Sequence, residues 1–578
     1  MPPSPTPRRH RTAALVVLAV VLAAFAGAVP PPSRPGGAVA CAAPAAAAAG
    51  AAILRHGGNA VDAAVATALA LAVVHPQAGN LGGGGFAVVR LGAEVASLDF
   101  REVAPATASR TMYLSPSGEP VPERSLVGAL AAGVPGSPAG LFELHRRFGV
   151  LPWRQVVAPA ERLARKGFVV TQRLHDNIAH ERALLSRFDF TAKVLLPGGE
   201  PPRVGTKMKL PRLADTLAAY AAEGPSAITV GRRAATLEAT TRALGGIVTA
   251  ADLASYRPVW REPIRFSAFG WEFASMPLPS SGGIILAESA GMLQRLGWAT
   301  LPRASADRAH LLVETWRRAF ADRFLLGDPS TTKAGPEQLL AAAWLDGRVA
   351  SIDRGRATAS ANVKPWSASP ESPETTHLSV IDSEGNAVAL TTTLNGSFGS
   401  GVLVAELGFL LNNEMDDFAT APGRPNMYGL IQGEANTVGP GKRMLSSMSP
   451  TVAWRGDEVL AVGSPGGSHI PTATLQVLLD LVVDGDALAD AVARPRLHHQ
   501  WQPDRLVYEA GALSAGVIAE LRRRGHALQQ ANQLGEVHAV RRAASGRVEA
   551  AADSRGPGAA AILDLGIGER QGRPEKEE

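Results

Sequence analysis

The chain has one cysteine, Cys41, in 578 residues. A single cysteine cannot form a disulfide within the chain, so an exported protein with this sequence must be held together by packing alone. We expect Cys41 itself to be a small buried residue. Aromatic residues make up only 5% of the sequence, and the formal net charge of +5 comes from scattered arginines. The sequence therefore has no basic patch interleaved with aromatics, and we predict no nucleic-acid partner.

Long apolar runs are also scarce, and the run from Ala13 to Phe25 has the layout of a secretory signal peptide. Arg8, Arg9 and Arg11 precede it, and small residues follow it. The run is short for a membrane span, so we predict cleavage after a signal peptide of residues 1–28 and a periplasmic or secreted protein with no stable membrane association. Anchoring by an uncleaved signal is the alternative. The charged tail, residues 569–578, is expected to be disordered.

The length allows one large α/β domain or two to three smaller ones. After the signal peptide, residues 36–75 predict a strand followed by two helices, with Pro44 in the first helical turn and Asn59 and Asp62 capping the second helix. The glycine run at 79–85 lacks the Lys-Ser/Thr ending of a phosphate loop, so close backbone approach is the better interpretation.

Patterns of apolar residues and breakers predict the other main elements. Helices are expected at 137–149, 153–166, 213–222, 284–296, 306–324 and 471–483. Strands are expected at 86–91, 95–100, 264–276 and 459–462, with one more from Gly408 that runs into an acidic turn ending at Phe418.

The stretch from Glu374 to Asn395 predicts two short strands joined by a tight loop. If Asp382 and Asn386 close a three-residue loop, Thr375 lies directly opposite Thr393. Taken alone, this hairpin favours two threonines that merely pack against each other, and other stretches of the sequence are needed to indicate a site.

Familiar hydrolase and metal patterns are missing. Neither GSPGGS at 463–468 nor SSMSP at 446–450 supplies the G-x-S-x-G elbow of a serine hydrolase. His498 and His499 are adjacent, and no third ligand is spaced to complete a zinc site. We predict neither a metal nor a cofactor.

Cleavage of the chain before Thr375 would give one residue both a nucleophile and a base. A proline-rich loop leads into Glu374 and makes the Glu374–Thr375 bond a plausible cleavage site. A free α-amino group has a pKa of about 7.7–8.0, so it can accept the proton of its own hydroxyl. Thr393 would orient that hydroxyl, and the backbone of Gly466 and Gly467 would bind an oxyanion.

Ten stretches in order resemble the γ-glutamyltranspeptidase family of N-terminal nucleophile hydrolases. They are GGNAVDAAVA at 57–66, GNLGGGGF at 79–86, DFRE at 99–102, PSSGG at 279–283, TTHLSV at 375–380, TLNGSFGSG at 393–401, LLNNEMDDF at 410–418, LSSMSPT at 445–451, GSPGGS at 463–468 and LHHQW at 497–501. The resemblance implies an α+β fold, a four-layer αββα sandwich built as one composite domain from both processed segments.

The same resemblance implies roles for individual residues. Thr375 is expected to cut the chain after Glu374, giving a large segment, 29–374, and a small catalytic segment, 375–578, that stay together as a non-covalent heterodimer. The other implied roles are binding of a substrate α-carboxylate by Arg101, Ser446 and Ser447, binding of its α-ammonium by Asn395, Glu414 and Asp417, an oxyanion hole at Gly466 and Gly467, and an aromatic lid at Tyr428.

The implied activity is that of a self-processing γ-glutamyltransferase. It would cleave glutathione and its conjugates through an ester on Thr375 and pass the acyl group to water, an amino acid or a dipeptide. A related threonine hydrolase for poly-γ-glutamate or β-lactam side chains, or an uncut inactive binding homologue, are the alternatives. Ala43-Pro44, Met444 and the LGDPS stretch at 326–330 depart from the family pattern, which bears on local packing and acceptor preference.

Overall fold

The computed structural model describes residues 34–332, 334–363, 375–424, 427 and 430–565. Residues 36–563 form one compact unit, whose fold is described here. The predicted signal peptide, the predicted charged tail, Glu374 and Tyr428 lie outside the described residues.

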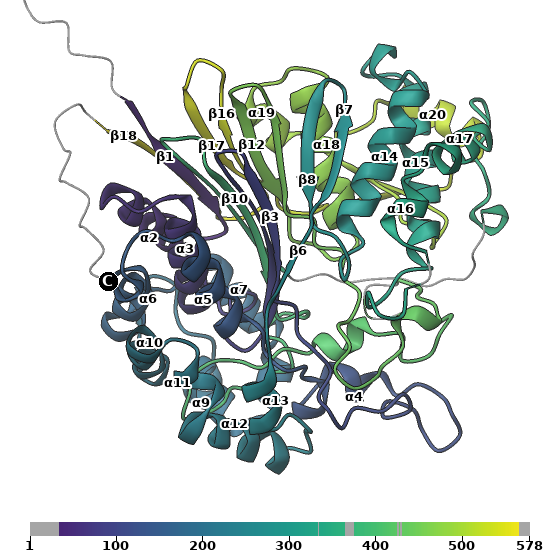
Figure 1. The fold of residues 1–578 in the computed structure, drawn as a ribbon. Helices are drawn as coiled ribbons and strands as arrows, with labels where there is room; N and C mark the ends of the chain where they lie inside the picture. Colours follow the sequence, from purple (N-terminus) through teal and green to yellow (C-terminus); the bar gives the residue numbers. More distant parts are fainter. Residues whose placement is uncertain (1–33, 333, 364–374, 425–426, 428–429, 566–578) are drawn as a thin grey trace, which may run out of the picture. The chain divides into compact units, whose positions relative to one another are not determined.

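Two large, mostly antiparallel sheets form the centre of this unit (Figure 1). The first sheet has the strand order β18 (Ala559–Leu565), β1 (Arg34–Cys41), β9 (Thr376–Asp382), β10 (Ala387–Thr393), β2 (Gly84–Leu91), β3 (Glu94–Asp99) and β6 (Val259–Arg261). The second has the order β17 (Val548–Ala552), β16 (His538–Arg542), β12 (Glu458–Gly463), β11 (Thr451–Arg455), β8 (Trp271–Ser275) and β7 (Ile264–Ala268). Each sheet combines strands from before and after position 375.

Alternating side chains show that the first sheet is buried on both faces. In β9, Leu378 and Val380 face the helical layer, whereas Ile381 packs into the core between the sheets. That inter-sheet core is built mainly from Ala and Val, so the two sheets approach closely. Helices α2 (Pro44–Arg55) and α3 (Ala60–Val74) lie on the outer face, and the alanines of α3 allow it to pack directly on β9 and β10.

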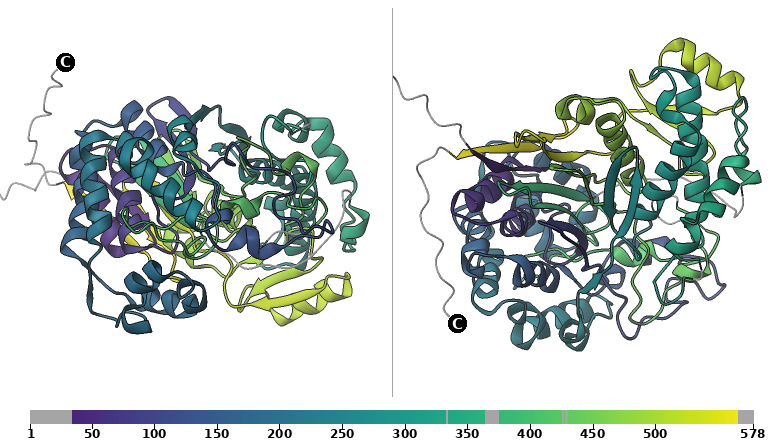
Figure 2. Two further views of the ribbon diagram at one scale, coloured as in Figure 1. Left: turned by 90° about the horizontal axis from the view of Figure 1, so that it is seen from below. Right: turned by 45° about the horizontal axis from the view of Figure 1, so that its top comes forward.

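The second sheet carries its own helical layer on its outer face. Helices α14 (Gly282–Arg295), α18 (His469–Val482) and α19 (Leu488–Ala493) pack on it, and α15 (Ala306–Arg323) packs on α14. Figure 1 shows the two sheets between these two sets of helices, and Figure 2 shows the same elements from two other directions. The predicted four-layer αββα sandwich is confirmed.

The remaining elements surround this sandwich. The helices are α4 (Pro122–Leu126), α5 (Ser137–Phe148), α6 (Trp153–Lys166), α7 (Gln172–His180), α8 (Arg182–Leu185), α9 (Asp189–Leu195), α10 (Pro211–Glu223), α11 (Ser226–Thr229), α12 (Gly231–Ala243), α13 (Ala250–Ser255), α16 (Pro336–Leu339), α17 (Ala342–Ala350) and α20 (Ala515–Arg523). The short 3₁₀ helices are η1 (Ala129–Ala131), η2 (Pro197–Gly199), η3 (Trp298–Thr300), η4 (Ser360–Asn362), η5 (Glu414–Asp417) and η6 (Glu434–Asn436). Two small sheets join β4 (Phe168–Val169) to β5 (Lys207–Met208), and β13 (Leu497–His498) to β14 (Leu506–Glu509) and β15 (Leu528–Ala531).

Most predicted elements form where the sequence signals place them. Pro44 begins α2, and Asn59 and Asp62 form a capping box at the start of α3. Two predictions were wrong. Residues 264–276 form a hairpin, β7 and β8, because Phe269 and Gly270 both adopt positive φ and reverse the chain. The strand predicted from Gly408 does not form: Leu410 and Leu411 make only isolated bridges before η5.

In the described part of the chain, no helix combines the length and apolar character needed to cross a membrane.

Candidate functional site

The hairpin of β9 and β10 has the predicted register. Thr376 pairs with Thr392, and the Asp382 N–H donates to the Asn386 carbonyl at 3.0 Å to close the loop. One further step in this register puts Thr375 opposite Thr393. Both side chains are buried. The Thr393 Oγ accepts a hydrogen bond from the Asn395 N–H at 2.8 Å, so the Thr393 hydroxyl proton remains available for a second partner.

Thr375 and Thr393 line a small pocket that also gathers most of the other predicted site residues. The cavity measures about 20 Å³, roughly the space of one water molecule. Its lining residues are Arg101, Arg323, Thr375, Thr393, Asn395, Glu414, Asp417, Leu430, Ser446, Ser447, Met448, Gly467 and Ile470. Gly466 adjoins Gly467 in sequence but does not line the cavity, and Tyr428 lies outside the described residues.

The glycine run at 79–85 positions the acidic turn η5. A Cβ on Gly82 would lie only 1.9 Å from the Leu410 carbonyl oxygen, so only glycine allows the two backbones to approach. The Asn412 side chain donates to the Gly82 carbonyl at 2.8 Å and accepts from the Glu414 N–H at 3.0 Å. These contacts agree with the interpretation of the run as a site of close backbone approach.

Arg101 lies two residues after the end of β3, and hydrogen bonds of its backbone fix its position. Its N–H donates to the Asp99 carboxylate at 2.9 Å, and its carbonyl accepts from the Tyr256 hydroxyl at 2.8 Å. The guanidinium is completely buried and donates to Glu414 and Asp417. Burial alone would lower the pKa of Arg101, but the surrounding carboxylates raise it, so the guanidinium is charged.

Three carboxyl groups, those of Glu102, Glu414 and Asp417, surround the guanidinium of Arg101. Glu102 lies 3.8 Å from Arg101 Nη1, too far for a hydrogen bond, and burial raises the pKa of Glu102 to about 7. Burial also raises the pKa of Glu414, although Arg101 opposes the shift. Arg101 alone therefore does not compensate the carboxyl groups around it, and the ammonium group of a ligand could pair with them.

Ser446 and Ser447 are held by the PSSGG loop before α14. The Ser446 carbonyl accepts from the Ser281 N–H at 2.9 Å, and the Ser446 N–H donates to the Pro279 carbonyl at 2.8 Å. A Cβ on Gly282 would lie 2.2 Å from Ser449 Oγ, which explains the glycine in this loop. The two serines are thus fixed on a rigid scaffold beside Arg101.

Gly466 and Gly467 form the turn between β12 and α18. Both have positive φ, 124° and 54°, a backbone conformation that L side chains rarely adopt. The turn leads into the first residue of a 14-residue helix, an arrangement that favours negative charge near the backbone N–H groups. Gly467 can therefore contribute to an oxyanion site opposite Thr375.

Buried polar atoms without a hydrogen-bond partner gather around this pocket. Among the described residues, Ser447 Oγ, Glu414 Oε2 and both carboxylate oxygens of Glu102 have none. Native proteins rarely leave such groups unpaired, because each one costs about 1–3 kcal/mol. We infer that Ser447 and Glu414 are arranged to bind a polar ligand.

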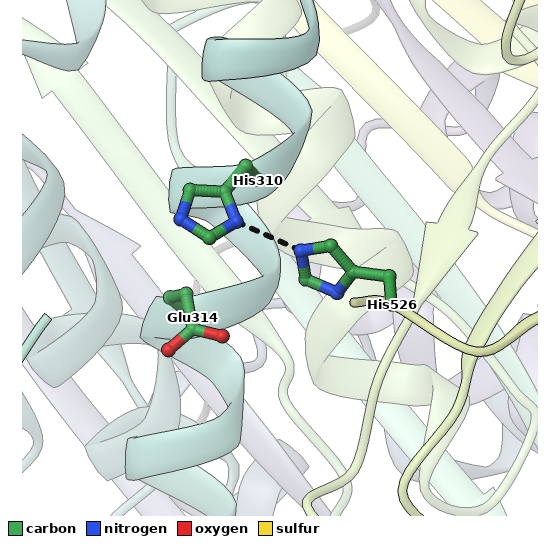
Figure 3. A group of neighbouring side chains, drawn as sticks. All are labelled: His310, Glu314 and His526. Carbon is green, nitrogen blue, oxygen red and sulfur yellow. Dashed lines mark hydrogen bonds between the residues drawn. The ribbon is translucent and has the colours of Figure 1, made fainter. Parts of the chain in front are cut away.

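The described residues contain one group with a metal-ligand composition: His310, Glu314 and His526 (Figure 3). Its nitrogen and oxygen atoms lie within 4.8 Å of one another. His310 Nδ1 and His526 Nε2 already share a hydrogen bond of 2.8 Å, and Glu314 is paired with Arg317 and Arg318. Two guanidinium groups beside the only carboxylate oppose the binding of a cation.

Sequence reasoning missed several residues at this site. Glu102 stood in the DFRE stretch and was given no role, because only the structure shows that its carboxyl group is buried without a partner. Arg323, at the end of α15, lines the pocket and donates to Ser281 Oγ at 3.0 Å. A charged residue at a helix end gave no signal that distinguishes it from a solvated one.

Comparisons with known proteins agree with this architecture. A family model described as Gamma-glutamyltranspeptidase matches residues 46–563. The "Glutathione hydrolase proenzyme" of Escherichia coli (strain K12) is 41% identical over 508 residues, which cover 87% of each chain. The cephalosporin acylase from Bacillus halodurans superposes with a TM-score of 0.80 at 27% identity, over 93% of this chain and 98% of that one. A gamma-glutamyltranspeptidase chain from Pseudomonas nitroreducens, complexed with L-DON, is 40% identical with a TM-score of 0.54, and covers 56% of this chain and 97% of its own length.

Proposed function

The chain belongs to the gamma-glutamyltranspeptidase family, and on that premise we propose that it is a self-processing γ-glutamyltransferase that also hydrolyses glutathione. One observation carries the proposal. Thr375, the predicted nucleophile, lines the same buried pocket as two arginines, two carboxylates and two serines. A γ-glutamyl group offers a carbonyl for attack and a zwitterionic head group for recognition.

In the proposed processing step, the Thr375 hydroxyl attacks the carbonyl of Glu374. The peptide bond shifts to an ester that water hydrolyses, which frees the α-amino group of Thr375. That amine then accepts the hydroxyl proton when Thr375 attacks a γ-glutamyl substrate. Support comes from the proenzyme relative of Escherichia coli. The Pseudomonas nitroreducens chain gives further support, because the 56% of this chain that it covers is comparable to the fraction of the chain in the proposed large segment, 29–374. The two segments would remain associated because both contribute strands to both sheets.

Recognition of the substrate would proceed by an exchange of ion pairs. In the empty pocket Arg101 is paired with Glu414 and Asp417. The α-carboxylate of a γ-glutamyl group would take over Arg101, with hydroxyl donors from Ser446 and Ser447. Its α-ammonium would then pair with the released carboxylates and with Asn395. A zwitterion adds one charge of each sign, so both of its charges find a partner while the net charge of the site stays the same.

The chemical step would use the turn after β12 and the hydroxyl of Thr393. Thr393 would donate to the Thr375 hydroxyl oxygen, since its own oxygen already accepts from Asn395. The Gly466–Gly467 backbone would stabilise the tetrahedral oxyanion, an effect of about 10²–10³ in rate per donor. Water or the amine of an amino acid or dipeptide would then resolve the γ-glutamyl ester. We further propose that Tyr428 covers the site and that the mature protein is periplasmic or secreted.

The likeness to a cephalosporin acylase makes amide cleavage of a β-lactam side chain the second candidate. The two candidates differ in the head group they recognise. Arg101, Glu414 and Asp417 together suit an α-amino acid with both α groups free. Kinetics with L-γ-glutamyl-p-nitroanilide and with glutaryl-p-nitroanilide, which lacks the α groups, separate them. We expect the first to react at least about a hundredfold faster.

Mass spectrometry of purified protein after incubation with a γ-glutamyl anilide tests the proposal directly. We expect two fragments, the smaller one beginning at Thr375 and carrying a γ-glutamyl adduct. Thr375→Ala should remain uncut, whereas Thr315→Val, which removes another buried hydroxyl within α15, should be cut normally. A small fragment that begins elsewhere, or normal cutting of Thr375→Ala, would refute the proposal, and a folded but uncut wild-type chain would support an inactive binding homologue.

A further inference from the structure

A second polar pocket lies beside the turn that contains Gly466 and Gly467. Its volume is about 210 Å³, and it shares no lining residue with the pocket of Thr375. The lining residues are His469, His498, Gln500, Pro503, Arg505, Val507, Gln529, Ala531, Gln533 and Leu534. We call it the Arg505 pocket.

One wall of the Arg505 pocket is a face of the small sheet. Strands β14 and β15 run parallel, and Val507 pairs with Gln529. Side chains two residues apart in a strand share a face, so Gln529 and Ala531 of β15 both line the pocket. Val507 of β14 and Arg505, directly before the first residue of β14, line it as well. The sequence thus places a cation and an amide side by side on a sheet face that opens onto a cavity.

Arg505 has no counter-ion in the described part of the chain. Its Nε is buried and has no hydrogen-bond partner among the described residues. The nearby carboxylate of Glu509 is already occupied, because Arg555 binds it at both oxygens. Arginine remains charged in proteins, so this pocket carries a permanent positive charge.

The two histidines of the lining, His469 and His498, are neutral at physiological pH, because burial lowers the pKa of both. Burial lowers the pKa of His469 to about 4, although the charge of Glu509 opposes the shift. Arg505 is therefore the one charged side chain of the lining, and Gln529 and Gln533 add amide groups. This composition matches a small molecule with a single negative charge and further polar groups.

The Arg505 pocket is linked to the turn by direct contacts. His469, which lines the pocket, is the first residue after Gly466–Ser468 and donates from its N–H to the Gly466 carbonyl at 2.9 Å. Gly535, next to the lining residue Leu534, packs against Gly466: a Cβ added to Gly466 would lie 3.3 Å from the Cα of Gly535. A molecule bound in the pocket would therefore contact His469, which donates to Gly466, and Leu534, which lies next to the Gly535 that packs against Gly466.

We propose that the Arg505 pocket binds a small monocarboxylate that carries an amide or amine, such as a free amino acid or a short peptide. The carboxylate pairs with Arg505, and the glutamine amides bind the remaining polar groups. Occupancy stabilises the turn at Gly466–Gly467 and thereby changes the rate of acyl transfer at Thr375. This last consequence rests on the proposed function, whereas binding itself does not.

Isothermal titration calorimetry with N-acetylglycine tests the binding. This probe has a carboxylate and an amide but no amine, so it can act neither as an acyl acceptor nor as a γ-glutamyl head group. We expect Arg505→Met to weaken binding at least about tenfold, Arg505→Lys to retain most of it, and the exposed control Arg522→Met to leave it unchanged. N-acetylglycinamide, which lacks the charge, should bind at least about tenfold more weakly than N-acetylglycine.

Three results would overturn the proposal: no detectable binding of N-acetylglycine, equal binding by Arg505→Met, or a loss caused by Arg101→Met instead. Titration with inorganic phosphate shows whether the pocket prefers an inorganic anion to a carboxylate. Arg505-dependent binding of phosphate without binding of N-acetylglycine also refutes the proposal. For the coupling, N-acetylglycine should change the rate of γ-glutamyl-p-nitroanilide hydrolysis in wild type but not in Arg505→Met. Binding without any rate change would overturn the coupling alone.

Discussion

Two networks of arginine and carboxylate in this protein, one fully buried and one with the exposed Asp504 at its edge, differ in charge balance. The site network consists of Arg101, Glu102, Glu414 and Asp417. The helix network consists of Glu314, Arg317 and Arg318 on α15, with Asp504. One guanidinium faces three carboxyl groups in the site network, whereas the helix network has two of each. Arg101, Glu414 and Asp417 of the site network also line the cavity of Thr375.

The pKa values show what the difference means. In the site network, burial raises the pKa of Glu102 and Glu414 because one arginine cannot compensate them all. In the helix network the pKa of Glu314 is lowered, since two arginines and the Thr358 N–H outweigh the desolvation of the buried carboxylate. A balanced network is complete without a ligand. An unbalanced one stays unsatisfied until a ligand enters, so we assign binding to the site network and stability to the helix network.

Replacing the arginine of the site network should have the largest effect on activity. We expect Arg101→Met to lower kcat/KM for γ-glutamyl-p-nitroanilide about 10²–10³-fold, because it removes the partner of the substrate carboxylate in a buried site. Stability should change less, since the neighbouring carboxyl groups can take up protons. Steady-state kinetics and thermal denaturation measure the two effects. A variant with unchanged kcat/KM would remove Arg101 from substrate recognition.

The helix network should respond in the opposite way. Arg317→Met leaves Glu314 with one arginine and removes the arginine beside Asp504, which keeps its contacts with His499 and the Ser360 N–H. We therefore expect the free energy of unfolding to fall by about 1–3 kcal/mol. The kcat/KM of the folded fraction should remain within about twofold of wild type. Chemical denaturation and active-site titration give the two quantities. Arg522→Met, on the exposed side of α20, is the control and should change neither.

The contrast also explains how much of the fold the sequence could predict. Elements whose signals are local were predicted: the capping box of Asn59 and Asp62, and the register of the hairpin set by Asp382 and Asn386. The prediction of a strand from Gly408 was wrong, because this segment is held by contacts to other loops. The Asn412 side chain, for example, donates hydrogen bonds to the carbonyls of Gly82 and Gly133. Such pairing depends on segments more than 270 residues away in the chain.

The site was predictable only through resemblance. Nothing in the spacing of Arg101 and Glu414, 313 residues apart, indicates an ion pair, whereas Glu314 and Arg318 are four apart on one helix and predict their own contact. The resemblance brought the site residues together. It did not predict the charge imbalance, since the burial of Glu102 arises from the close packing of Gly84 and Gly133 around it.

That imbalance predicts a pH effect at Glu102. Its folded pKa of about 7 exceeds its ordinary value of 4.5, so the folded state holds the proton longer than the unfolded state. Ionisation of Glu102 therefore costs stability as pH rises from 4.5 towards 7. Glu102→Gln cannot ionise, and we expect it to gain about 1–3 kcal/mol relative to wild type between pH 5 and pH 8.

Thermal denaturation of wild type and Glu102→Gln at the two pH values measures this gain. Glu314→Gln in the helix network is the matched comparison. The pKa of Glu314 is lowered in the folded state, so its contribution is already complete above pH 5 and is lost only as pH falls through the folded pKa. Its destabilisation should therefore be equal at pH 5 and pH 8. Parallel pH profiles for the two variants would contradict the assigned difference between the networks.

The smallest expected effects come from one hydroxyl beside each network. Ser447 Oγ is buried without a partner among the described residues, so Ser447→Ala removes no hydrogen bond from the empty protein and should leave its stability unchanged or slightly raised. It should raise KM for γ-glutamyl-p-nitroanilide and lower kcat/KM about 3–10-fold, because a hydrogen bond of this kind contributes about 0.5–1.5 kcal/mol. Ser351 Oγ instead accepts from Arg318 Nε at 2.8 Å, so Ser351→Ala should lower stability by a similar free energy without any kinetic effect. If Ser447→Ala lost stability and kept its kinetics, the hydroxyl would serve the fold, and the unpaired polar atoms of the site network would no longer indicate a ligand.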